Sequence, residues 1–190
     1  LPFALHQEGE TIYKAGRGFV EMTSQDYIAY NGISYPTIWS IGCPFKCTYC
    51  GNSKFIEYDD GYRRVRHPSP EYIIAEIEAA KEKHPFISEI VFHDDSFMAL
   101  KPQLLEEFAN QFREKIGLPF FVSGVIPNYV RDEKIESLLH GGLNRLRMGV
   151  QSGSERILDF YKRPTPPEKI FSATQSIGKY AEYMIAPAYD

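Results

Sequence analysis

The sequence of 190 residues has no long apolar run and no excess of positive charge. Because no stretch approaches the ~18 consecutive apolar residues of a membrane-spanning helix, we expect no membrane partner. Lysine and arginine number 21, and aspartate and glutamate number 25, which gives a net charge of −4. The chain therefore lacks the basic surface typical of nucleic-acid-binding domains, and we do not expect it to bind a nucleic acid.

Cysteine is scarce as well, and its distribution excludes a disulfide framework. The 3 cysteines are Cys43, Cys47 and Cys50, so the rest of the chain has none. An odd number confined to one short segment does not match the paired cysteines of secreted, disulfide-stabilised domains. Residues 1–3 also lack the charged start of a secretory leader.

The composition that is present is typical of a folded domain. Hydrophobic residues make up 43% and charged residues 24%, which excludes disorder of the whole chain. Aromatic residues reach 14%, and this richness favours a ligand pocket or an interface. The chain begins with Leu1 and stops inside an apolar segment, so we expect it to be part of a longer protein.

Short apolar runs alternate with helical periodicity from residue 36 onward. Strands are predicted at 36–41, 89–93, 119–123, 143–150 and 183–189. Helices are predicted at 69–83, 101–116, 131–140, 152–161 and 167–180. Repeated β–α units of this size predict a parallel sheet with helices outside it, either open or curled into a barrel. Residues 1–35 break the pattern and are expected to form an irregular leader or linker.

Polar residues follow each of the first four predicted strands. They are the cysteine segment 43–50 and the segments 93–95, 123–124 and 149–154. Because the carboxyl ends of parallel strands meet at one edge of a sheet, these residues are expected to converge on one site. Alternation along the fourth strand places Arg147 on the same face as Gln151, where it either meets a ligand or forms a buried ion pair.

The cysteine spacing, C-x3-C-x2-C, leaves three interpretations. A buried thiol cluster is the simplest. A zinc site needs a fourth ligand, and the histidines that follow the motif, His67, His84, His93 and His140, do not have the spacing of a zinc finger. An iron–sulfur cluster held by three thiolates keeps one iron open, which is typical of a metal that binds a substrate.

The cysteine motif, with Tyr49 before its last cysteine and a predicted strand before its first, resembles the radical S-adenosylmethionine (radical SAM) superfamily over residues 36–190. Segments 39–50, 66–76, 92–97 and 148–154 are similar to the branch that carries an N-terminal cobalamin-binding domain. The resemblance implies an α/β fold, a partial (β/α)6 TIM-like barrel that stops here after about five strands. Residues 36–190 would then be a C-terminally incomplete catalytic domain, and residues 1–35 a linker from a domain outside the chain.

The same resemblance implies two sets of binding residues. Cys43, Cys47 and Cys50 would ligate a [4Fe-4S] cluster. The residues expected to bind S-adenosylmethionine are Tyr49, Asp94, Asp95, Ser123, Gln151, Ser152 and Asp190. Only one of the two adjacent aspartates is expected to meet the amino group of the cofactor, and the sequence leaves open which one.

The function implied is reductive cleavage of S-adenosylmethionine to a 5′-deoxyadenosyl radical, which abstracts hydrogen from a substrate that the sequence does not identify. Cobalamin, held outside this chain, would extend the reaction to methylation or rearrangement. An electron donor such as flavodoxin or ferredoxin is the expected partner, and a reducing cytoplasm the expected location, because the thiols must stay unoxidised. The alternatives are an iron–sulfur electron-transfer or sensor module, and a methylthiotransferase-like enzyme that modifies RNA or protein.

Overall fold

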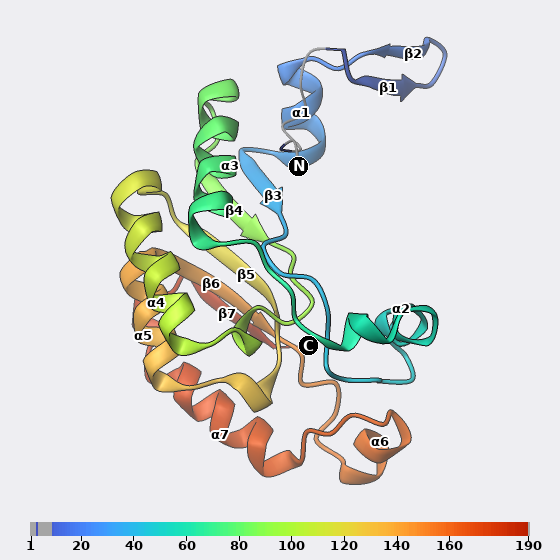
Figure 1. Ribbon diagram of the computed structural model, residues 1–190, viewed down its shortest axis with the longest axis vertical. Helices are drawn as coiled ribbons and strands as arrows, with labels where there is room; N and C mark the ends of the chain where they lie inside the picture. The colour runs from blue at the N-terminus through green and yellow to red at the C-terminus, as the bar shows by residue number, and fades with distance from the viewer. Residues whose placement is uncertain (1–2, 4–8, 190) are drawn as a thin grey trace.

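A computed structural model describes residue 3 and residues 9–189, and for residues 186–189 it describes the backbone alone (Figure 1). Five parallel strands form one sheet in the order β3-β4-β5-β6-β7. They are β3 (Ser34–Thr37), β4 (Glu89–Phe92), β5 (Phe120–Val125), β6 (Leu143–Met148) and β7 (Ala186–Tyr189). This arrangement confirms the predicted parallel α/β sheet, in which consecutive strands are neighbours.

Four helices cover one face of the sheet, as Figure 1 shows. They are α3 (Pro70–Lys83), α4 (Pro102–Gln111), α5 (Asp132–Gly141) and α7 (Pro167–Gly178). Their ends follow the sequence signals: Ser69 caps α3 by accepting a hydrogen bond from the Tyr72 amide, and Pro70 occupies the first turn. A π-helical turn, Phe112–Ile116, extends α4 to Gly117, which has the left-handed conformation of a helix C-cap.

Aromatic side chains fill the space between the sheet and these helices. Phe108 of α4 stacks on Trp39 at a centroid distance of 4.6 Å and contacts Phe92 of β4 edge-to-face at 5.6 Å. Phe112 and Phe120 continue the cluster with a centroid distance of 4.8 Å. Much of the aromatic richness of the sequence therefore serves the hydrophobic core.

The N-terminal region is more ordered than the sequence pattern indicated. The prediction of an irregular segment is wrong, because residues 11–31 form an antiparallel hairpin, β1 (Thr11–Lys14) with β2 (Gly18–Glu21), and a helix, α1 (Ser24–Asn31). A capping box between Thr23 and Asp26 starts α1. The ring of Tyr27 stacks on His84 at 4.7 Å, which fastens α1 to the end of α3.

Other boundaries also differ from the prediction. The first sheet strand is Ser34–Thr37 and not 36–41, because the backbone beyond Thr37 turns to bond with the residues after β4. The helix predicted at 152–161 is α6 (Glu155–Phe160), since the preceding residues form a loop. The last strand begins at Ala186, after a 3-10 turn at Ala181–Tyr183.

Several short elements complete the fold. Helix α2 (Asn52–Tyr58), absent from the sequence prediction, directly follows the cysteines. The remaining 3-10 turns are Asp60–Arg63, Phe97–Ala99 and Pro127–Tyr129. Across the ranges described, none of the helices combines the length and apolar character needed to cross a bilayer.

Candidate functional site

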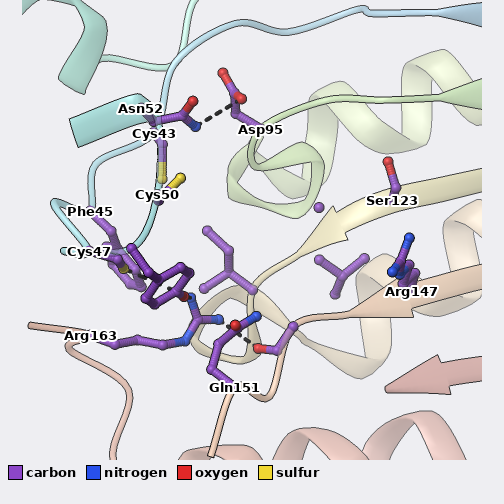
Figure 2. Close-up of a pocket in the computed structure, with 15 residues that line it drawn as sticks. Cys43, Phe45, Cys47, Cys50, Asn52, Asp95, Ser123, Arg147, Gln151 and Arg163 are labelled. Carbon is purple, nitrogen blue, oxygen red and sulfur yellow. Dashed lines mark hydrogen bonds between the residues drawn. The ribbon is translucent and has the colours of Figure 1, made fainter. Parts of the chain in front are cut away.

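One cavity of about 270 Å³ lies where the cysteine segment meets the carboxyl ends of β4, β5 and β6 (Figure 2). This is the convergence that the strand pattern predicted. The residues lining it are Cys43, Phe45, Cys47, Tyr49, Cys50, Asn52, Asp95, Ser123, Gly124, Val125, Ile126, Arg147, Gly149, Gln151 and Arg163. In Figure 2 the cysteines lie along one side, and Ser123 and Arg147 lie on the strand ends opposite.

Residues 43–50, here called the cysteine loop, run between β3 and α2. Cys43 and Cys47 are 8% and 5% exposed, and Cys50 is half-buried. The Cys43 amide donates to the carbonyl oxygen of Tyr62 at 3.0 Å, which holds the loop against the segment after α2. Gly42 permits this approach, because a Cβ there would lie 2.4 Å from the carbonyl oxygen of Arg64.

Three soft thiolates on one short loop are a donor set that fits an iron–sulfur cluster. Burial raises the pKa of Cys43 to about 11, so its thiol is protonated near neutral pH unless a bound cation favours the thiolate. In the part of the chain that the structure describes, no group of histidine, cysteine and acidic side chains is placed to hold one metal ion. A four-iron cluster spreads its ligands, because each thiolate binds a different iron. None of the four histidines considered as zinc ligands lines the cavity.

The two adjacent aspartates face different surroundings. Asp94 is 2% exposed and accepts hydrogen bonds from the Trp39 amide at 3.1 Å and from the amide and hydroxyl of Ser40. It thereby fastens the segment entering the cysteine loop to the end of β4. Burial raises the pKa of Asp94 to about 6, although these hydrogen bonds oppose the shift.

Asp95 lines the cavity, whereas Asp94 does not. One carboxylate oxygen accepts from Asn52 Nδ2 at 2.9 Å, and the other accepts from the Gly42 amide at 3.0 Å and the Tyr62 hydroxyl at 2.6 Å. A carboxylate has about four acceptor positions, so one position on the oxygen facing Asn52 stays open. Asp95 is the only acidic residue among the described residues that line this cavity.

The other predicted residues divide between the cavity and its surroundings. Ser123 lines the cavity and donates to the carbonyl oxygen of Phe92 at 2.8 Å. Gln151 also lines it, with a left-handed backbone (φ 67°) that is unusual for a residue other than glycine. Ser152 does not line it, and its hydroxyl accepts from the Ser154 amide at 3.1 Å. Asp190 lies outside the described residues.

The sequence pattern missed one charged residue of the site, Arg163 in the turn after α6. Its guanidinium donates to the Gly149 carbonyl at 2.6 Å and to the Tyr49 hydroxyl at 3.0 Å. The Tyr49 ring also packs edge-on against Tyr161 at a centroid distance of 4.9 Å, and burial raises the pKa of Tyr49 to about 12. No motif surrounds Arg163, so only the folded chain reveals its position.

Comparison with known proteins identifies relatives of this chain. A family model described as the radical SAM superfamily matches residues 37–181. The chain is 24% identical over 161 residues to an uncharacterized methyltransferase of Pyrococcus horikoshii, covering 84% of this chain and 34% of that protein. It is 24% identical over 160 residues to the anaerobic magnesium-protoporphyrin IX monomethyl ester cyclase of Rubrivivax gelatinosus, covering 83% and 27%. The chain thus spans about a third or less of the length of these relatives.

Solved structures show the same fold. The cobalamin-dependent S-adenosylmethionine radical enzyme OxsB has a TM-score of 0.65 at 15% identity, over 94% of this chain and 29% of that one. The radical S-adenosylmethionine methyltransferase TsrM from Kitasatospora setae has a TM-score of 0.67 at 15% identity, over 89% and 32%. These likenesses confirm the predicted barrel type, of which the present chain is a part.

Proposed function

Because the chain belongs to the radical SAM superfamily, we propose that it is the catalytic core of an enzyme whose cavity holds a [4Fe-4S] cluster beside S-adenosylmethionine. The observation that carries this proposal is the meeting of three thiols with polar groups from three strand ends in a single cavity. A module that only transfers electrons has no need of those polar groups, so their presence favours catalysis over the electron-transfer alternative.

Cys43, Cys47 and Cys50 are the proposed ligands of the cluster. Soft thiolates suit iron, and three of them leave one iron of four open for a further ligand. When bound, such a cluster supplies the electron that cleaves S-adenosylmethionine and so yields a radical able to abstract hydrogen. Cys43 and Cys47 are buried, which shields two of the three proposed ligands from water.

Asp95, Gln151 and Ser123 are the proposed contacts to S-adenosylmethionine. The open acceptor position of Asp95 suits the ammonium group, because a carboxylate forms a charge-assisted hydrogen bond with it. The Gln151 amide offers both donor and acceptor atoms to ribose hydroxyls. The Ser123 hydroxyl donates to Phe92 and keeps its acceptor positions for the cofactor. Asp94 is assigned to the support of the cysteine loop, since its oxygens accept bonds from buried groups.

We further propose that the intact protein uses cobalamin, held outside this chain, for methyl transfer. Support comes from the methyltransferase of Pyrococcus horikoshii and from the cobalamin-containing structures of OxsB and TsrM. A one-electron donor such as flavodoxin or ferredoxin is the proposed partner. We place the protein in the cytoplasm, since oxygen and disulfide exchange would remove the free thiols.

The test is electron paramagnetic resonance (EPR) of the anaerobically reconstituted, dithionite-reduced protein, with and without S-adenosylmethionine. A [4Fe-4S] signal that changes on adding the cofactor is the expected result. Cys50→Ser is expected to lose this signal, whereas Ser152→Ala, outside the cavity, retains it. A cluster signal indifferent to the cofactor refutes the catalytic proposal in favour of electron transfer. Stoichiometric zinc in place of iron refutes the cluster itself.

A further inference from the structure

The turn after α6 places a buried positive charge beside the cysteine loop. Arg163 is 8% exposed, and its Nη1 lies 3.0 Å from the Tyr49 hydroxyl and 4.0 Å from Cys47 Sγ. Its Nε is buried without a hydrogen-bond partner. Within the described ranges no carboxylate pairs with this guanidinium, whose other contact is the Gly149 carbonyl.

The backbone around Arg163 fixes this charge in place. The Arg163 amide donates to the Leu158 carbonyl at 2.9 Å, and its own carbonyl accepts from the Thr165 amide at 2.8 Å. The neighbouring Tyr161 carbonyl accepts from the Thr48 amide at 2.9 Å, so the turn is joined directly to the cysteine loop. A fixed charge acts on its surroundings without the cost of reorienting a mobile side chain.

A buried guanidinium without a carboxylate is unfavourable unless another anion stands nearby. The nearest candidate is the sulfur of Cys47, which becomes anionic when it ligates iron. The potential of an iron–sulfur cluster depends on hydrogen bonds to its sulfurs and on the charge around it. A cation at this place favours the reduced cluster, because reduction adds a negative charge.

We propose that Arg163 raises the reduction potential of the cluster by holding its guanidinium against the Cys47 sulfur. The inference rests on the proposed function, since it requires a cluster on the three cysteines. Arg163 is thus a tuning residue, built into the turn after α6, that makes the cluster easier for an electron donor to reduce.

The test is an EPR-monitored redox titration of the anaerobically reconstituted intact protein without S-adenosylmethionine. For Arg163→Gln we expect the ratio of reduced to oxidised cluster to fall about tenfold at a fixed potential, equivalent to about 59 mV for a one-electron couple. Arg163→Lys retains the charge and is expected to stay close to the wild type. Iron and sulfide analysis establishes that the compared samples carry the same cluster.

A further variant separates the buried charge from the net charge of the protein. Lys162→Gln removes a neighbouring exposed charge. It is expected to keep a ratio near the wild type. An equal shift in Lys162→Gln and Arg163→Gln overturns the proposal, because the effect would then belong to net charge.

An unchanged ratio in Arg163→Gln also overturns it, even where that variant binds S-adenosylmethionine more weakly. If Arg163→Gln assembles no cluster, the test relies on Arg163→Lys. A ratio of reduced to oxidised cluster equal to that of the wild type in Arg163→Lys supports the role of the charge. A tenfold fall of this ratio, although the charge is retained, refutes it. A wild-type protein without iron instead refutes the proposed function, so the two failures are distinguishable.

Discussion

Gly124, at the carboxyl end of β5, is the position where one methyl group is expected to do the most damage to the site. Its backbone is left-handed (φ 71°), and a Cβ there would lie 2.0 Å from the carbonyl oxygen of Asp94. The left-handed conformation costs an alanine about 1–2 kcal/mol. Relieving the overlap with a backbone atom adds about 1–3 kcal/mol, the usual cost of overpacking. Gly124→Ala is therefore expected to lose about 2–5 kcal/mol of unfolding free energy.

Gly153→Ala is the matched control, because it lies in the loop after β6 with open space around its Cβ position and no left-handed backbone. We expect it to change stability by less than about 0.5 kcal/mol. The assay is urea denaturation of the cluster-free, reduced proteins, with stabilities compared by linear extrapolation. A loss below about 1 kcal/mol for Gly124→Ala, or one equal to that of Gly153→Ala, would refute the close approach of the two strand ends.

Three further predictions follow from the core, the buried carboxylate and the cavity. Phe108→Ala is expected to lose about 3–5 kcal/mol in urea denaturation, because the ring packs among buried aromatics, whereas the exposed Phe171 tolerates alanine. Burial raises the pKa of Asp94 from 3.8 to about 6, so the folded state binds a proton more tightly than the unfolded state. The stability gained from this proton is present in full below a pH of about 3.8 and is lost as the pH rises through 6. The stability of the cluster-free wild type relative to Asp94→Asn should thus fall by about 2 kcal/mol from about pH 4 to about pH 7, and a difference independent of pH would contradict the raised pKa. Asp95→Asn is expected to weaken S-adenosylmethionine binding at least about tenfold in anaerobic equilibrium dialysis, because it loses a charge-assisted hydrogen bond, and unchanged affinity would remove Asp95 from the site.

Local signals were sufficient where residues close in sequence decide the structure. Ser69 and Pro70 begin α3, and Gly117 ends the helical segment that contains α4, because capping depends on the next few residues alone. The position of the cysteine loop was equally predictable, since a loop after a parallel strand must emerge at the carboxyl edge of the sheet. The hairpin and α1 were missed because their strands are short and the fastening contact, Tyr27 on His84, joins distant segments.

The same limit applies inside the site. Asp94 and Asp95 are consecutive carboxylates after a strand, and neither composition nor spacing distinguishes them. The hydrogen bonds donated by Trp39 and Ser40 hold the Asp94 side chain inside the fold, whereas the Asp95 side chain lines the cavity. Arg163 escaped notice for a related reason: an arginine that follows a short helix usually lies in solvent, and its burial depends on how the turn meets the cysteine loop.

These contacts together fasten the cysteine loop to three other parts of the chain. Its entrance is fastened to residues 94–96, since Ser40 bonds to Asp94 and Ser96 donates to the Gly42 carbonyl at 2.8 Å. Tyr62 accepts a bond from the Cys43 amide, and the turn after α6 accepts one from the Thr48 amide. Because these bonds arise from three separate parts of the chain, the backbone that carries the three thiols is fixed by the fold. Such a fixed backbone would lower the entropy lost when the proposed cluster binds.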